Sequence, residues 1–223
     1  MSLQTIIDSA SFITINKRKG IGQTISRSGH IKTSVQQGSL YRFTVGVDAG
    51  LKYSTNRDLL EDIDTLDRNV EANVDIGETN TGLSYLTAYQ GDLSGAQLDQ
   101  LVVPNASGGN IYVSTSSVTG NVVGYTNLFK KGDYIQPLGN TSTYRYPYQV
   151  TSDIAWSVSS NITVPVHRPV LEQDGVTLSA SHGLRVGNEV RFHVKALVMP
   201  TYTVVPYDRI SFDSDFELIE VLT

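Results

Sequence analysis

The histidines are the first residues to test for chemistry, because imidazole acts as a general base and as a metal ligand near neutral pH. The chain has four, and no two of them have the spacing of a metal-binding pair. His193 falls on the polar face of a predicted strand, His182 lies beside a predicted turn, and His30 lies in a basic segment. We expect these three to be exposed. His167, which precedes Arg168, is expected to be partly packed.

Common catalytic motifs are missing from the sequence. The chain contains no cysteine, which excludes disulfides, thiolate metal sites and a cysteine nucleophile. It has no Gly-x-Ser-x-Gly, His-Glu-x-x-His or lysine-bearing phosphate-loop motif. The members of a catalytic triad are dispersed along a chain, so a triad of that kind stays open. The sequence therefore predicts that the protein is not an enzyme and has no catalytic, cofactor-binding or metal-binding residues.

A cluster of acidic residues between positions 58 and 67 is the other candidate for chemistry. Its spacing lacks the glycine and the terminal glutamate of a calcium loop. Helical periodicity instead distributes the acids over the solvent face of a predicted helix. We interpret this face, and Asp58 and Asp62 in particular, as a contact surface for a basic partner. The acidic residues of the cluster are Asp58, Glu61, Asp62, Asp64 and Asp67.

Charge is distributed unevenly along the 223 residues, which sum to −5. Residues 9–47 contain no acid and six bases, so this segment is +6 and the remaining 184 residues, with 11 bases and 22 acids, are −11. Unlike surfaces of this kind favour head-to-tail contact between copies, which closes into a ring where the rotation permits. The bases that we place at a partner interface are Lys17, Arg18, Lys19, Arg27 and Lys32.

A nucleic acid or a membrane is a less suitable partner. Aromatic residues that could stack on bases are few near the basic segment, and strand alternation explains Phe12 and Tyr41. The net negative charge also argues against specific nucleic-acid binding. No apolar run reaches 18 residues, and the first residues lack the pattern of a secretory signal. The expectation is a chain that neither enters a membrane nor is exported.

Hydrophobic periodicity predicts the first half of the chain as a strand over 11–16, a projecting hairpin or arm over 20–39, a strand over 40–47 and a helix near 55–69. Ser54 or Thr55 is the predicted helix cap. The apolar stripe of this helix comprises Leu59, Leu60, Ile63, Leu66 and Val70. Residues 94–97 (SGAQ) form a capping box that predicts a second, short helix.

The rest of the chain reads as short strands separated by turn residues. We predict a strand over 83–89 and a loop over 104–110. Pro147 indicates an edge strand or a bulge. The further predicted strands cover 111–115, 134–137, 144–151, 161–166, 176–179, 189–198 and 210–221. The fold class expected is mainly β, an antiparallel β-sandwich or small barrel with one flanking α-helix and an extended N-terminal arm, divided into 1–39 and 40–223 or forming one domain.

Several stretches resemble tail tube, baseplate and distal tail proteins of tailed bacteriophages, and the resemblance as a whole extends over about half of the chain. The order of the motifs carries the resemblance: a strand, a helix beginning near an Asn-Arg pair, a Gly-Asp corner, a Tyr-x-Val-Thr strand, an apolar strand ending near proline, and an acidic closing strand. The stretches are 41–45 (YRFTV), 53–67 (YSTNRDLLEDIDTLD), 131–136 (KGDYIQ), 148–153 (YQVTSD), 161–166 (NITVPV) and 210–220 (ISFDSDFELIE).

This resemblance implies a structural subunit of the virion, made in the host cytoplasm, that assembles into a ring, usually a hexamer. The ring would form part of the tail tube, its initiating layer or the distal baseplate, contact neighbouring tail proteins, and let DNA pass through its lumen. Family members carry no catalytic residues, so none is transferred. The resemblance does not identify the layer of the tail.

Two other functions stay open at this stage. Tyr144, Tyr146 and Tyr148 recur with period two and would form an aromatic platform of the kind found in carbohydrate-binding modules, although packing in an edge strand is the favoured explanation. A capsid-decoration or head-tail connector protein belongs to the same structural class as a tail subunit, so its sequence chemistry would look the same.

Overall fold

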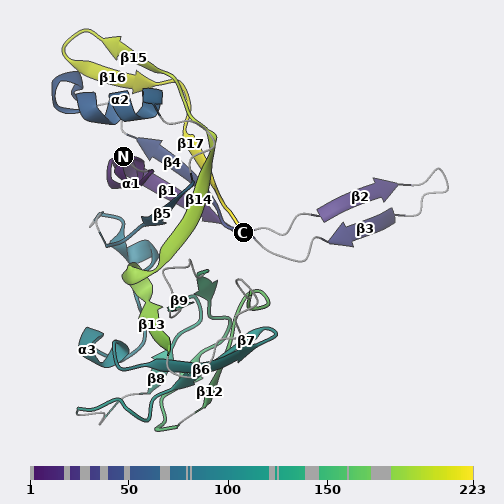
Figure 1. Cartoon of the computed structure of the whole chain (residues 1–223). Coiled ribbons are helices and arrows are strands. Elements are labelled where there is room, and N and C mark those ends of the chain that lie inside the picture. The colour runs from purple at the N-terminus through teal and green to yellow at the C-terminus, as the bar shows by residue number, and fades with distance from the viewer. Residues whose placement is uncertain are drawn as a thin grey trace. The chain divides into compact units, whose positions relative to one another are not determined.

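The computed structural model confirms the mainly β class, with 44% strand and 16% helix in antiparallel sheets (Figure 1). It describes residues 3–17, 21–25, 31–35, 40–47, 51–65, 71–78, 80, 82–120, 124, 126–138, 146–159, 161–171 and 182–222. No helix in this part of the chain is long and apolar enough to span a membrane.

The chain divides into two compact units. The first unit comprises Met1–Ala72 and Val194–Leu222, and the second unit comprises Asn73–His193. The expected division of the chain into 1–39 and 40–223 stays a prediction.

The first unit is built on a five-stranded sheet. Its order is β1-β4-β17-β14-β5, and the last two strands also supply residues to the second unit. The alternation predicted over 40–47 is confirmed, because Tyr41, Phe43 and Val45 are buried. The strands are β1 (Ala10–Asn16), β4 (Arg42–Val47), β17 (Phe216–Glu220), β14 (Arg191–Val198) and β5 (Glu71–Asp75).

A hairpin of β2 (Ile21–Ile25) and β3 (Ile31–Val35) follows β1 and forms a two-stranded antiparallel sheet of its own. This confirms the predicted hairpin within 20–39. The register pairs Ile21 with Val35 and Ile25 with Ile31.

Helix α2 (Arg57–Thr65) corresponds to the predicted helix but begins later, after the 3-10 turn η1 (Tyr53–Thr55). Leu59, Leu60 and Ile63 are buried, as the apolar stripe predicted. The rest of that stripe, at 66 and 70, lies outside the described residues. The predicted cap is wrong, because the Leu60 amide donates to the carbonyl of Asn56 (3.2 Å) and Ser54 bonds elsewhere.

The remaining elements of the first unit are a short helix and a second hairpin. They are α1 (Gln4–Asp8), β15 (Tyr202–Val205) and β16 (Arg209–Phe212). The strand predicted over 210–221 is therefore two strands, β16 and β17. They are separated at Asp213, whose carboxylate accepts hydrogen bonds from the amide and the hydroxyl of Thr201 (3.0 and 2.7 Å).

The second unit contains a curled six-stranded sheet in the order β10-β9-β13-β6-β7-β12. Its strands are β10 (Tyr148–Gln149), β9 (Tyr134–Pro137), β13 (His182–Val186), β6 (Val102–Ser107), β7 (Asn110–Ser114) and β12 (Ile162–Pro165). The other elements are η2 (Ser84–Leu86), α3 (Gly95–Leu98), β8 (Asn127–Phe129), β11 (Ile154–Ala155) and η3 (Gly187–Glu189). Apolar side chains from the sheet, with Leu128 and Phe129 of β8, form one buried core.

The capping box at the start of α3 is confirmed, with the Ser94 amide donating to the side chain of Gln97 (3.0 Å). Two other predictions for the second unit are wrong. The strand expected over 83–89 is the 3-10 turn η2 with flanking turns. The loop expected over 104–110 is mostly β6, where a bulge between Val102 and Asn105 accommodates the intervening proline. The predicted strand over 176–179 lies outside the described residues.

Candidate assembly surfaces

Strand β1 forms an edge of the five-stranded sheet. An edge strand offers main-chain N–H and C=O groups to another chain, and monomeric proteins protect such strands with charges, proline or short length. β1 is seven residues long and contains neither a charged residue nor a proline. Ser11, Phe12 and Thr14 are exposed on it. This combination makes β1 a suitable strand for pairing with another copy.

The start of β1 is fixed in place by its contacts with Gly46 of β4. The register shifts between Ala10 and Phe12, which marks a bulge or irregularity. The Ser11 hydroxyl donates to the carbonyl of Gly46 (3.0 Å). A Cβ added to Gly46 would lie 1.9 Å from Cε1 of Phe12, so the aromatic ring occupies the space that the glycine leaves. The sheet edge is therefore ordered by contacts within its own unit.

The terminal strands of the second unit's sheet behave differently, because they bond to each other. Residues directly after β10 and β12 form an antiparallel bridge between Val150 and Val166. The His167 amide donates to the carbonyl of Gln149, and the Gln149 amide donates to Nδ1 of His167, both at 3.0 Å. The two ends of the curled sheet thus meet, as in a barrel, and satisfy main-chain groups that an open edge would expose. His167 is half-buried, as predicted.

Pro147 precedes β10, which is a terminal strand, so the edge position inferred from this proline is confirmed. Its carbonyl accepts a hydrogen bond from Nη2 of the buried Arg168 (3.1 Å). The guanidinium lies 5.8 Å from the ring centroid of Tyr146 and 5.4 Å from that of Tyr148. Both tyrosines are buried, so these two cannot form an exposed sugar-binding platform. Tyr144 lies outside the described residues.

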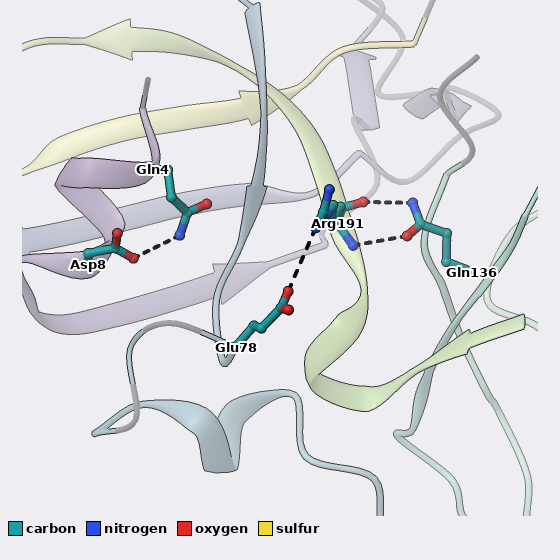
Figure 2. A network of polar contacts seen from close by, with 5 residues as sticks. All are labelled: Gln4, Asp8, Glu78, Gln136 and Arg191. Atoms are coloured by element: carbon teal, nitrogen blue, oxygen red, sulfur yellow. Dashed lines mark hydrogen bonds and ion pairs between the residues drawn. The ribbon is translucent and has the colours of Figure 1, made fainter. Parts of the chain in front are cut away.

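Gln136 of β9 joins the second unit's sheet to the start of β14. Its side-chain amide donates to the carbonyl of Arg191 (2.8 Å), and its side-chain oxygen accepts from the Arg191 amide (3.0 Å). The guanidinium of Arg191 lies 3.9 Å from a carboxylate oxygen of Glu78 (Figure 2). The glutamine is buried, whereas the ion pair is about half exposed. The buried pair of bonds is therefore the stronger constraint.

The Gly-Asp corner is held by a buried carboxylate. Gly132 has a φ of +106°, a left-handed conformation that favours glycine. The two carboxylate oxygens of Asp133 accept hydrogen bonds from the amides of Gln90 (2.9 Å) and Lys130 (2.8 Å). Burial raises the pKa of Asp133 above its ordinary value, and these hydrogen bonds oppose that rise. This carboxylate therefore fixes the main chain of the corner to the segment at Gln90.

Two histidines expected to be exposed are buried. His193 lies in β14, with Nδ1 at 3.2 Å from the side-chain oxygen of Asn73. His182 lies in β13, opposite Val103 of β6. Exposure was expected because His193 lies on the same strand face as Arg191 and Lys195 and His182 lies beside a predicted turn, but strands distant in sequence contact both histidines. His30 lies outside the described residues.

The seven predicted interface residues fall into three groups. Lys17, directly after β1, and Asp58, in the first turn of α2, are exposed. Lys32 lies in β3 opposite Thr24, and Asp62 lies in α2. For these two residues the structure describes the backbone only. The other predicted bases, Arg18, Lys19 and Arg27, lie outside the described residues. The expected contacts of all seven with a partner stay predictions.

Within the described ranges, no group of three or more His, Cys, Asp or Glu side chains is arranged to hold a metal ion. Comparison with protein-family models finds no match for the chain, and comparison with curated proteins finds none either.

Proposed function

We propose that the chain is a structural subunit of a bacteriophage tail that associates with its own copies into a ring, in the tail tube, its initiating layer or the distal baseplate. The observation that carries this proposal is that β1 is an edge strand among the strands that the structure describes. A long strand without charge or proline is an aggregation hazard on a monomer, and pairing with a defined partner removes that hazard. The resemblance of the sequence to tail proteins supplies the setting, and a hexamer is the ring that it favours.

In this proposal the work of the chain is assembly, without catalysis. The β1 edge of one copy pairs with a sheet edge of the next, and repetition of this head-to-tail contact closes the ring. The second unit, whose sheet edges already meet, keeps its fold independently of that contact. Because the chain is −5 overall, DNA passing through the lumen would not be retained by a net positive charge.

The β2–β3 hairpin is proposed to strap onto an adjacent copy or a neighbouring tail protein. A two-stranded hairpin is marginally stable by itself in water. The acid-free segment 9–47, at +6, complements the −11 of the remaining chain. Contact with a negative neighbour would therefore stabilise the hairpin and fix its orientation.

The test is light scattering after size exclusion, followed by electron microscopy of any large species. The wild-type chain should form rings. Thr14→Lys places a charge on the exposed face of β1 and should abolish them, because lysine opposes edge pairing. Thr163→Lys is the matched control, since Thr163 is equally exposed on β12 of the second unit.

Persistence of a monomer at high concentration would contradict the proposed function. Equal effects of the two lysine substitutions would remove β1 as its basis. Replacement of Lys17, Arg18 and Lys19 by glutamate tests the strap separately: it should weaken assembly while the monomer stays folded. Unchanged ring formation at moderate salt would count against the strap alone.

A further inference from the structure

The turn between β15 and β16 presents an aromatic side chain to solvent. Tyr207 is 95% exposed, more than any other large hydrophobic residue in the described part of the chain. Its φ is 67°, and that of Asp208 is 61°. Every other described residue with a positive φ is a glycine. A tyrosine held in the left-handed region is energetically unfavourable, and such outliers concentrate at functional positions.

The turn is fixed by hydrogen bonds to η1. The Ser54 amide and hydroxyl donate to the two carboxylate oxygens of Asp208 at 2.9 and 2.5 Å. The Tyr53 amide donates to the main-chain carbonyl of Asp208 (3.1 Å), and the Ile210 amide to that of Leu51 (2.9 Å). The backbone of the turn at Tyr207 is therefore held by hydrogen bonds, so ordering this backbone on binding costs little conformational entropy.

Basic side chains surround this turn. Lys52 and Arg209 face each other across an isolated antiparallel bridge, and both are exposed. Like charges at directly opposite positions repel each other. Arg57 lies over the ring of Tyr53, 5.2 Å from its centroid. One acid, Asp208, lies within this group: Ser54 donates to both of its carboxylate oxygens, and Lys52 and Arg57 attract the carboxylate electrostatically.

An acidic surface lies beside this basic one in the same unit. Asp58 and Glu61 of α2 are exposed. The Tyr202 hydroxyl donates to Asp64 of the same helix (2.7 Å), which places α2 against the β15–β16 hairpin (Figure 1). The basic group with its exposed tyrosine and the exposed acids therefore lie on elements of one unit that contact each other.

We propose that this surface binds a second copy of the chain about a two-fold axis, with Tyr207, Lys52 and Arg209 of each copy on the exposed acids of α2 in the other. A patch that contains both signs of charge side by side is self-complementary under a two-fold rotation. Tyrosine and arginine are the side chains that most often dominate protein interfaces. A copy of this acidic chain supplies the carboxylates, and the contact is separate from the one proposed at β1.

The first test measures self-association by analytical ultracentrifugation in the Thr14→Lys chain, where the β1 contact is removed. A dimer should remain there. Tyr207→Gly should weaken it by about tenfold or more, as expected for a central interface residue, while the melting temperature is unchanged or higher because glycine tolerates the positive φ. A Thr14→Lys chain that is monomeric at every concentration would overturn this inference and leave the proposed ring untouched.

The second test exchanges the charges. Lys52→Glu and Glu61→Lys should each weaken the dimer, and the double variant should restore it, because the two residues meet between copies. Lys131→Glu, at an exposed position of the second unit, is the control and should have no effect. A double variant no better than either single one would overturn the proposal. Unchanged self-association combined with loss of binding to a single-stranded oligonucleotide in Lys52→Glu would overturn it in favour of a nucleic-acid contact.

Discussion

The two units of this chain treat the edges of their sheets in opposite ways. In the second unit the ends of the six-stranded sheet meet at the Val150–Val166 bridge, and prolines stand at 147 and 165. In the first unit β1 ends the sheet with seven residues that carry no charge and no proline. Main-chain groups that the second unit satisfies internally lie at a sheet edge in the first unit. The proposed assembly through β1 rests on this contrast between the two units.

This contrast predicts that a core substitution in the second unit acts on folding. Phe129 is fully buried and makes an edge-to-face contact with Tyr89, with ring centroids 6.2 Å apart. Phe129→Ala should lower the free energy of unfolding by about 3–5 kcal/mol, through lost burial and the cavity left behind. Urea denaturation measures this. A loss well below this range would mean that the core of the curled sheet tolerates truncation.

Arg191 allows a buried and an exposed contact to be compared at one residue. Gln136→Ala removes both hydrogen bonds to the main chain of Arg191 and should lower the free energy of unfolding by about 1–3 kcal/mol. Glu78→Gln removes the half-exposed ion pair and should cost less than about 1 kcal/mol. Denaturation midpoints of the two variants give the order. The reverse order would show that the ion pair, and not the glutamine, holds this part of β14.

The start of β1 can be tested through the glycine that Phe12 covers. Gly46→Ala should lower the free energy of unfolding by about 1–3 kcal/mol, because the added methyl group meets the ring. Phe12→Ala in the same chain should recover part of this loss, since the ring is then absent. Thermal melts of the two single variants and the double variant measure the coupling. If the losses of the two single variants simply add in the double variant, Phe12 and Gly46 are not energetically coupled.

The smallest effect is expected at the β15–β16 turn and depends on pH. Hydrogen bonds from the Ser54 hydroxyl and amide hold the pKa of Asp208 below its ordinary 3.8. A carboxyl group with a lowered pKa stabilises the fold above that ordinary value, and the contribution is lost as the pH falls through the lowered one. Asp208→Asn keeps a residue that tolerates positive φ. This substitution should lower the melting temperature at neutral pH, and the decrease should be smaller in acid. An equal decrease at neutral and at acidic pH would exclude the charge of Asp208 as the cause.

Elements with strong local signals were predictable from the sequence. The alternation of Tyr41, Phe43 and Val45, the stripe of Leu59, Leu60 and Ile63, and the capping box at Ser94 each depend on neighbours within one element. β6 was missed because Pro104 and polar residues resemble a loop. A signal was nevertheless present, since Gly108-Gly109 joins β6 to β7 as a two-residue hairpin turn.

Features that depend on distant strands were not predictable in this way. His182 and His193 are buried by partners 79 and 120 positions away in the sequence, at Val103 and Asn73. The edge position of β1 follows from the strand order, which no local pattern contains. The turn at Tyr207 was also missed, because tyrosine gives no sign of a positive φ and its support, Ser54, resembled a helix cap.

The most direct test of the open edge is hydrogen–deuterium exchange of the full chain at low and at high concentration. If copies pair through β1, its amides become protected as copies assemble, while those of β12 exchange at the same rate in both conditions. Exchange from β1 that does not change when large species form would contradict the claim that copies pair through this strand.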